Sequence, residues 1–161
     1  MSKMPWLYCP TLSENNQIEL PLEELRHLVN SHRRRVGDSF VLFNGKGTVA
    51  VAELRDLTKR PLHGRVEIVS RETHSLPARK IHLASALPKG DRQGLLLDLV
   101  TQLGNTDFTP LDCALSIART QAAGYERWQR IVIETCKQCR RPWLPRLHYG
   151  SSPVTHLVRN M

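Results

Sequence analysis

A run of three arginines is the first group of side chains in this sequence that offers a specific chemistry. Arg33, Arg34 and Arg35 are adjacent, so their guanidinium groups repel one another unless anions lie nearby. Each guanidinium group can bind a phosphate through two parallel hydrogen bonds. The sequence therefore predicts phosphate contacts here, and the alternative is a solvated surface loop.

A second cationic group lies in the segment Lys89-Gly90-Asp91-Arg92, where a strand is expected to meet a helix. In an open parallel sheet, ligands bind at the carboxyl ends of the strands. Lys89 and Arg92 are therefore expected to bind an anion. A capped helix start, with Asp91 as the N-cap, would explain Gly90 and Asp91 equally well.

A third cationic group, with two aromatic residues between its members, follows the last predicted helix. Aromatic faces stack on unpaired bases, and guanidinium groups bind the phosphates beside them. Trp143 has an equal alternative as a core residue behind the helix. The group consists of Lys137, Arg140, Arg141, Trp143, Arg146 and Tyr149.

The cysteines and histidines suggest no catalytic or metal site. Cys136 and Cys139 have CxxC spacing, but a tetrahedral zinc site needs four ligands, and the sequence has no second CxxC or paired histidine. We interpret both as buried thiols on an apolar helix stripe. The seven histidines are scattered, and no phosphate-cradling glycine loop is present, so no catalytic residue is expected.

The charge favours a polyanionic partner, with a solvated basic surface as the alternative. The net charge is +8, and composition (40% hydrophobic, 24% charged) permits a folded core. Residues 1–72 hold 11 basic and 9 acidic side chains and residues 73–161 hold 12 and 6, so the second half is expected to be more electropositive. No apolar run approaches the ~18 residues that cross a membrane, and no signal peptide is recognisable. We expect a soluble, cytoplasmic protein with reduced cysteines.

The first half of the chain is predicted to form a small β-barrel. The segment Asn44-Gly45-Lys46-Gly47 is typical of a hairpin turn, because Asn and Gly tolerate a positive φ. Several short strands with regular turns suggest a barrel. The expected elements are a helix over Pro21–Asn30, strands over Ser39–Phe43, Thr48–Leu54 and Arg65–Ser70, and a turn at Pro61 and Gly64.

The second half is predicted to form a parallel βαβ unit. Its first helix has Leu96, Leu99, Val100 and Leu103 at one-face spacing, and Gly104 suits its C-terminal cap. Strand, helix, strand in this order implies parallel strands. The expected elements are strands over Ile81–Leu87, Phe108–Leu111 and, near the end, Leu147–Tyr149, and helices over Asp91–Leu103 and Tyr125–Cys139.

Short motifs in a fixed order run through nearly the whole chain. The first half has His27-Leu28, Gly37-Asp38 and Leu42-Phe43-Asn44-Gly45, and the second half has Ala86-Leu87-Pro88-Lys89-Gly90-Asp91-Arg92 and Gln138-Cys139-Arg140-Arg141. Each piece alone is weak, but the ordered series is specific. In this series the chain resembles the RsmE family of 16S ribosomal RNA uridine-N3 methyltransferases.

The resemblance implies a two-domain α/β protein: a PUA-like RNA-binding barrel over residues 1–72, a linker over 73–80, and a SPOUT-type parallel-sheet domain over 81–161. It also implies S-adenosylmethionine as methyl donor, ribosomal RNA or the small ribosomal subunit as partner, and a homodimer. The residues expected to contact RNA are Arg33, Arg34, Arg35, Lys89, Arg92, Arg119, Arg140 and Arg141.

The departures from the family pattern limit what is carried over. Leu99 and Gln102 stand where the family usually has Lys and Glu, and Arg140 stands where it usually has Gly. The family's GPEGG-like loop and RTETA-like motif, which form the donor-binding knot and much of the dimer contact, do not occur in this sequence. We therefore expect an incomplete SPOUT domain that binds RNA but alone holds no cofactor and transfers no methyl group, and we do not carry over the dimer. The alternatives are a fragment of a working enzyme, a non-catalytic RNA-binding module and a protein–protein adaptor.

Overall fold

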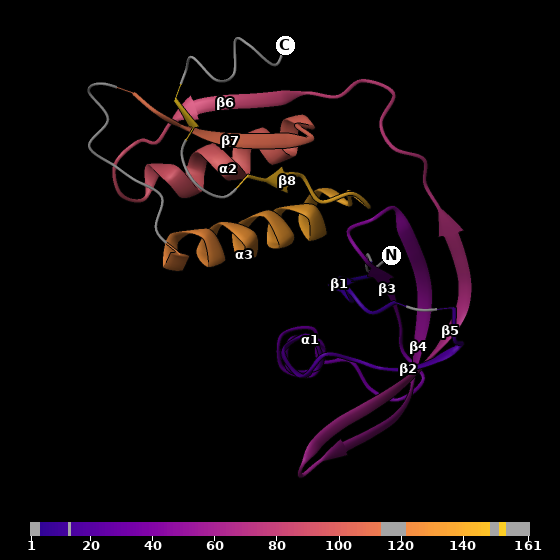
Figure 1. Ribbon diagram of the computed structural model, residues 1–161. Helices are drawn as coiled ribbons and strands as arrows, with labels where there is room; N and C mark the ends of the chain where they lie inside the picture. The colour runs from indigo at the N-terminus through magenta and orange to yellow at the C-terminus, as the bar shows by residue number, and fades with distance from the viewer. Residues whose placement is uncertain (1–3, 13, 114–121, 149–151, 154–161) are drawn as a thin grey trace. The chain divides into compact units, whose positions relative to one another are not determined.

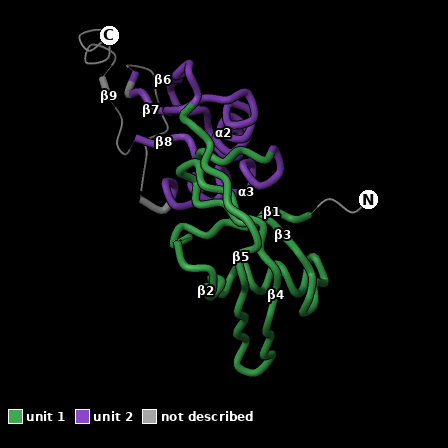
Figure 2. The backbone as a smooth tube through the Cα atoms, turned by 90° about the vertical axis from the view of Figure 1, so that its right-hand side faces the viewer, with its two compact units in different colours: residues 1–76, 140–143 green, residues 77–139, 144–161 purple. Residues whose placement is uncertain are grey.

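A computed structural model describes residues 4–12, 14–113, 122–148 and 152–153, and the chain divides into two compact units (Figures 1 and 2). Unit 1 comprises Met1–Leu76 and Arg140–Trp143, and unit 2 comprises Pro77–Cys139 and Leu144–Met161. The four residues that follow the last helix thus belong to the first unit. The domain boundaries expected from the sequence remain a prediction.

Unit 1 is built on a five-stranded sheet in the order β1-β3-β4-β5-β2 (Figure 1). β1 runs parallel to β3, and the other neighbours are antiparallel. The predicted strand over Ser39–Phe43 is confirmed, whereas the two strands after it are longer than expected. The strands are β1 (Trp6–Tyr8), β2 (Gln17–Glu19), β3 (Ser39–Phe43), β4 (Thr48–Lys59) and β5 (Leu62–Thr73).

The turn between β3 and β4 confirms the hairpin predicted from Asn44 and its glycines. The Asn44 side-chain oxygen accepts hydrogen bonds from the backbone N–H groups of Lys46 (2.7 Å) and Thr48 (3.0 Å). Gly47 has a φ of +95°, which a residue with a side chain rarely adopts. The predicted turn at Pro61 is confirmed, since β4 ends at Lys59 and β5 begins at Leu62. Gly64 is not part of it, because Gly64 lies inside β5, where an added Cβ would lie 2.7 Å from Leu25 Cδ1. Close packing, not chain reversal, requires glycine there.

The predicted helix over residues 21–30 is observed as two short helical segments. α1 spans Leu22–Arg26, and a π-helical turn, η1, spans His27–Ser31. In η1 the His32 N–H donates to the His27 carbonyl at 3.2 Å. The wider turn still places Leu25 and Leu28 in the core. Such π turns occur often at functional sites, and simple apolar spacing does not reveal them.

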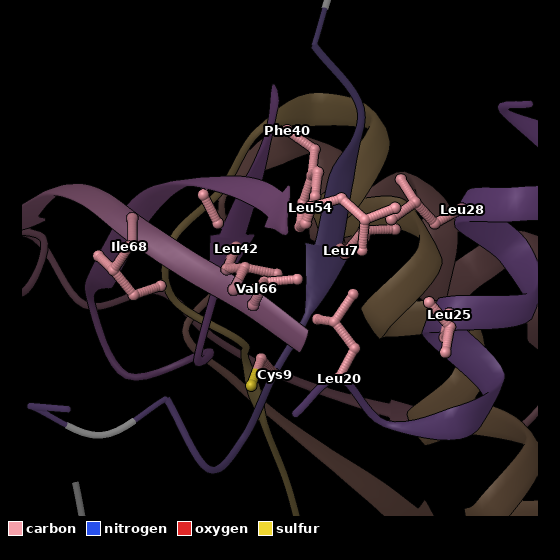
Figure 3. Packing of buried hydrophobic residues seen from close by; sticks show 12 residues of the cluster. Leu7, Cys9, Leu20, Leu25, Leu28, Phe40, Leu42, Leu54, Val66 and Ile68 are labelled. Atoms are coloured by element: carbon pink, nitrogen blue, oxygen red, sulfur yellow. The ribbon is translucent and has the colours of Figure 1, made fainter. Parts of the chain in front are cut away.

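The core of unit 1 lies between the sheet and α1 (Figure 3). Alternate residues of β3, β4 and β5 point to it, as the two-residue period of a strand requires. Each large side chain buried in this way stabilises the fold by about 1.5–3 kcal/mol. The buried cluster consists of Leu7, Cys9, Leu20, Leu25, Leu28, Phe40, Leu42, Ala50, Ala52, Leu54, Val66 and Ile68.

Unit 2 contains a parallel sheet in the order β6-β7-β8, with β9 also paired to β7. The predicted βαβ unit is confirmed, since α2 connects β6 to its parallel neighbour β7. The strands are β6 (His82–Ala86), β7 (Asp107–Asp112), β8 (Arg146–Leu147) and β9 (Ser152–Pro153).

Two helices of unit 2, α2 (Arg92–Leu103) and α3 (Ala122–Cys139), pack against each other. The Thr135 hydroxyl donates to Asp98 Oδ1 at 2.6 Å and thereby joins the helices. The Trp128 ring meets Phe108 of β7 edge-on, with ring centroids 5.9 Å apart. α3 is therefore fixed both to its neighbouring helix and to the sheet.

The apolar face predicted for α2 is wrong. Leu97 and Thr101 are buried, whereas Leu95, Leu99 and Leu103 are 57%, 48% and 80% exposed. Three consecutive leucines (95–97) supply apolar residues in several directions, so their spacing does not fix the buried face.

The stripe predicted for α3 is correct for most of the helix. Trp128, Val132, Thr135 and Cys136 are all buried. Cys136 is thus the buried thiol that was predicted, but the same prediction is wrong for Cys139, which is exposed at the last residue of the helix. Within the described ranges, no helix combines the length and hydrophobicity that crossing a membrane requires.

Candidate nucleic-acid interface

The loop that carries the three arginines is held by its own backbone. Arg33 has a φ of +51°, and the Arg34 N–H donates to the Leu28 carbonyl at 3.1 Å, which closes the loop onto η1. The Arg35 N–H donates to the Asp38 carboxylate at 2.8 Å, and the Asp38 N–H returns a bond to the Arg35 carbonyl at 3.0 Å. Arg33 and Arg35 are exposed on this fixed turn.

Arg34 differs from its two neighbours because its side chain is partly buried. Its Nε is shielded from solvent and has no hydrogen-bond partner in the described part of the chain. A shielded donor without an acceptor costs free energy, and an anion placed beside it would remove that cost. The loop thus presents two exposed guanidinium groups and one that is partly desolvated, a suitable arrangement for phosphate groups.

The predicted anion site at the carboxyl end of β6 is an exposed turn. Lys89 and Arg92 are both exposed, and Gly90 has a φ of +60°. Asp91 occupies the N-cap position of α2, but its side chain caps nothing. Its carboxylate instead accepts a hydrogen bond from Arg127 Nη2 of α3 at 3.0 Å, so the side-chain cap expected from the sequence is wrong. The Asp91 side chain thus connects the start of α2 to α3 instead of capping α2.

The third cationic group is not a single cluster. Lys137 is nearly buried and bonded to Glu134 at 2.7 Å in unit 2. Arg140 and Arg141 belong to unit 1, where Arg140 is exposed and Arg141 is partly buried. The Nε atom of Arg146 lies 4.0 Å from Oδ1 of Asp107, in unit 2. Tyr149 and the predicted contact Arg119 lie outside the described residues.

Trp143 has a structural role in unit 1, but it is only partly buried and packs on the β3–β4 turn, so it is not the core residue behind the helix that was the alternative to base stacking. Its indole N–H donates to the carbonyls of His74 (3.2 Å) and Ser75 (3.0 Å). Its ring covers Gly47, where a Cβ would lie 2.4 Å from the Trp143 Cζ2 atom. The Gly47 N–H also donates to the Pro142 carbonyl at 3.0 Å. These bonds fasten residues 142 and 143 to the β3–β4 turn.

A cluster of titratable side chains on the parallel sheet was missed in the sequence. His82 Nε2 lies 2.8 Å from Thr109 Oγ1, and His148 Nε2 lies 3.2 Å from Asp107 Oδ1. The two imidazole rings stack with centroids 5.4 Å apart. The three strands bring together residues up to 66 positions apart in the sequence, so only the strand order reveals the cluster.

The pKa of Asp107 in this cluster is lower than that of an ordinary aspartate. Burial raises it, but hydrogen bonds from Thr106 and His148 and the positive charges of His148 and His82 together outweigh burial. The group is a local ion-pair network, with His148 and Asp107 as its closest charged pair. No set of three or more His, Cys, Asp or Glu side chains with metal-binding geometry occurs among the residues described.

The residues at the carboxyl end of β6 are open to solvent. Lys89, Gly90, Asp91 and Arg92 are all exposed, and a Cβ added at Gly90 would meet no atom within 4 Å. A donor held for in-line transfer needs a site that fixes its position and excludes water. The described residues of this edge provide charge, but they do not provide such an enclosure.

Two family models match consecutive parts of this chain. The model described as "RNA methyltransferase PUA domain" matches residues 20–67, within unit 1. The model described as "RNA methyltransferase domain" matches residues 74–159, which is more than half of the chain. Both architectures and their order agree with the fold class predicted from the sequence.

Individual relatives agree with these matches. The ribosomal RNA small subunit methyltransferase E of Synechocystis sp. is 35% identical over 130 residues, which cover 80% of this chain and 41% of the relative. The Bacillus subtilis protein of the same name is 32% identical over 129 residues, covering 78% and 50%. The chain thus spans about half the length of the curated relatives it matches.

A solved structure shows the same fold. The crystal structure of a ribosomal RNA small subunit methyltransferase E from Neisseria gonorrhoeae, bound to S-adenosyl methionine, has 31% sequence identity and a TM-score of 0.84. The match covers 98% of this chain and 65% of that one. The chain therefore belongs to the RNA methyltransferase family, and its relatives there are of the ribosomal RNA small subunit methyltransferase E type.

Proposed function

We propose that this chain binds ribosomal RNA and serves as the RNA-binding part of an S-adenosylmethionine-dependent 16S rRNA uridine-N3 methyltransferase. The observation that carries the proposal is the arginine loop of unit 1. Backbone hydrogen bonds hold this loop, two of its guanidinium groups are exposed and one is partly desolvated. A fixed loop loses little conformational entropy when it binds, so its cations can contribute more of their attraction to affinity.

The proposed RNA contacts fall into three groups along the chain. The first is Arg33–Arg35, the second is Lys89 with Arg92 at the carboxyl end of β6, and the third is Arg140–Arg141 after α3. Arg119 remains a sequence-based candidate. The ribosomal RNA or small ribosomal subunit is the proposed partner, and the cytoplasm is the expected location because ribosomal RNA is there.

The chain by itself is proposed not to transfer a methyl group. The donor-bound relative has a further part, about a third of its length, that this chain does not match, and the exposed turn after β6 encloses no donor. S-adenosylmethionine, when bound, supplies the methyl group. The proposed contribution of these residues is to bind and orient the RNA.

Two measurements on the purified 161-residue chain test this proposal. Titration with a labelled 16S rRNA fragment should show binding that weakens linearly on a log–log plot as salt increases. Calorimetry with S-adenosylmethionine and its demethylated product should show no heat of binding. Methyl transfer to the RNA by this chain alone would refute the proposal that the chain is inactive by itself. Absence of RNA binding at low salt would refute the proposal that it binds ribosomal RNA.

A second candidate function, a non-catalytic RNA-binding module, is supported by specific substitutions. Arg140 adds a cation where the family usually has Gly, although the backbone there has a φ of +57°. Leu99 replaces the usual Lys and is 48% exposed. Saturable RNA binding without activity, even after the family's remaining segments are fused to the chain, would favour this candidate. A chain that binds only proteins would support the adaptor alternative.

A further inference from the structure

The end of the β4–β5 hairpin is a projecting part of unit 1 that the proposed function does not use. Both strands are 12 residues long, and in two perpendicular views their connected ends extend beyond the rest of the unit (Figures 1 and 2). Leu57 and Leu62 still pack against the core cluster. The residues between them, Thr58–Pro61, are all exposed and lie outside that cluster.

The charges at the turn of this hairpin are positive. Lys59, Arg60 and Arg65 are exposed, and none forms an ion pair among the residues that the structure describes. Arg65 lies between two acids in the strand register, Asp56 of β4 and Glu19 of β2, so its charge is partly balanced. By contrast, no acid lies opposite Lys59, which pairs with Leu62. Arg55, farther down the hairpin, forms ion pairs with Glu53 and Glu67, each at 2.6 Å.

We infer that the end of this hairpin, through Lys59 and Arg60, is a further RNA contact that binds phosphates of the same RNA as the arginine loop. The inference rests on the proposed RNA binding. Exposed cations gain free energy when phosphates replace their diffuse counterions, because the ions condensed on the RNA are released. Such contacts position the RNA without reading its sequence.

The hairpin is supported by the helix that leads to the arginine loop. Leu25 of α1 packs directly on Gly64 of β5, so closely that a Cβ at Gly64 would overlap it. Leu25 is 1% exposed, and η1 continues from α1 to the loop at Arg33. The two cationic elements therefore share one core within unit 1. Because both belong to one folded unit, one RNA chain that contacts both pays a smaller ordering cost than it would for two unlinked segments.

The test compares two variants that lose the same charge. In Lys59→Ala/Arg60→Ala the hairpin end loses one lysine and one arginine. In the control, Arg79→Ala/Lys80→Ala, the same two residue types are lost from an exposed segment of unit 2. Binding of a fluorescein-labelled RNA stem-loop is measured by anisotropy at several salt concentrations, and circular dichroism checks folding.

The hairpin variant should lower the slope of log K against log salt by roughly 1.4–1.8 units, since each lost phosphate contact removes about 0.7–0.9. The control should change it by much less. Equal changes in both variants would show that only total charge matters and would overturn the inference. If the unaltered chain fails to bind, the proposed function itself is refuted.

A second measurement on the unaltered chain decides the matter even if the hairpin variant fails to fold. Lysines are acetylated with a water-soluble reagent with and without the RNA stem-loop, and the modified sites are identified by mass spectrometry. Bound RNA should reduce acetylation of Lys59 several-fold and leave Lys80 unchanged. Both lysines are exposed in the free chain, so each serves as a valid reporter. Unchanged reactivity of Lys59 in saturating RNA would contradict the contact.

Discussion

At the end of α3 the chain reverses through Arg140, whose φ of +57° lies in the left-handed region. For a residue with a Cβ this conformation costs about 1–2 kcal/mol, whereas glycine adopts it freely. The family's usual glycine at this position therefore has a physical explanation. Arg140 retains the turn at an energetic cost, and the exposed guanidinium is what it adds.

The variant Arg140→Gly should separate these two effects. We expect it to stabilise the chain by about 0.5–1 kcal/mol in urea unfolding, because relief of the left-handed strain outweighs the added freedom of glycine in the unfolded chain. In RNA titrations the same variant should lose roughly one phosphate contact from the salt slope. Arg141→Gly is the control, since Arg141 lacks a positive φ. A stability gain of equal size in that control would contradict the strain argument.

The packing of the Trp143 ring against the β3–β4 turn requires glycine at position 47. Alanine at Gly47 would place a Cβ 2.4 Å from the indole ring and 2.6 Å from the His74 carbonyl oxygen, in addition to a φ of +95°. We expect Gly47→Ala to destabilise the chain by about 3 kcal/mol or more, as overpacking and backbone strain combine. Gly37→Ala is matched in φ (+91°) but meets no atom within 4 Å, so it should cost only about 1–2 kcal/mol. Urea unfolding of both variants measures the difference, and equal losses would show that the indole contact is unimportant.

Asp107 gives the chain a defined response to acid. Its lowered pKa means that the ionised carboxylate stabilises the fold at pH values above the ordinary aspartate range, and that this stabilisation is lost as the pH falls through the lowered value. In His148→Phe, the Asp107 pKa should rise, because burial then meets less opposition. The stabilisation by Asp107 should therefore be lost at a higher pH in the variant than in the parent chain. At pH values where Asp107 is ionised in the parent, we expect the free energy of unfolding of the variant to be lower by about 0.5–1 kcal/mol.

Carboxyl-carbon NMR titration of Asp107 reports the pKa directly, and acid unfolding reports the stability. The matched control is His63→Phe, which removes an imidazole 3.3 Å from a mostly exposed carboxylate, Glu19. Because solvent screens that pair, its loss should leave acid unfolding unchanged. An unaltered Asp107 titration in His148→Phe would show that the hydrogen bond and charge of His148 have no influence.

At the scale of the element, the many leucines of α2 prevent the sequence from revealing which face of the helix is buried. Leu97 is 1% exposed and Leu95 is 57% exposed, although the two residues differ by only two positions. Leu97→Ala should destabilise unit 2 by about 2–5 kcal/mol through lost burial and a residual cavity. Leu95→Ala should change stability by less than about 0.5 kcal/mol. Thermal unfolding of both variants tests the orientation, and the reverse order of effects would mean that the helix is rotated.

Most elements could be predicted from the sequence because their signals are local. The Asn44 turn, the Gly104 cap and the stripe of α3 each depend on residues within one or two turns of chain. The π turn, the face of α2 and the bond from Arg127 to Asp91 could not be predicted. The buried face of α2 and the bond from Arg127 to Asp91 depend on residues distant in the sequence, and the π turn leaves no mark on the apolar spacing. Tertiary contacts overrode local propensity at those places.

The candidate site shows the same division. The positions of Arg33–Arg35, Lys89 and Arg92 on exposed turns followed from flanking strand and helix signals. The cluster of His82, Asp107 and His148 depends on the order of three parallel strands. The sequence allowed Trp143 either to stack on a base or to have a structural role. Its contact with Gly47, almost 100 residues earlier in the sequence, favours the structural role. Long-range pairing is the information that a single sequence lacks.

At the scale of the whole molecule, the chain joins two units that are not simply consecutive. Residues 140–143 belong to unit 1, although the segments on both sides of them belong to unit 2. The same short segment contains Arg140 and Arg141, proposed as RNA contacts, and Trp143, which binds the β3–β4 turn. A proposed binding segment is thus also bonded to the sheet of unit 1. The contacts of Pro142 and Trp143 fix the backbone next to the two arginines.

The net charge of +8 alone would attract any polyanion, so a test of specific contacts must hold charge loss constant. Arg33→Ala/Arg35→Ala removes the two exposed cations of the arginine loop. We expect this variant to lower the salt slope by roughly 1.4–1.8 units. Arg79→Ala/Lys80→Ala removes the same charge from an exposed segment and should change the slope far less. Anisotropy titrations with a 16S rRNA fragment provide the comparison, and identical slopes for the two variants would show that a diffuse field, not the loop, holds the RNA.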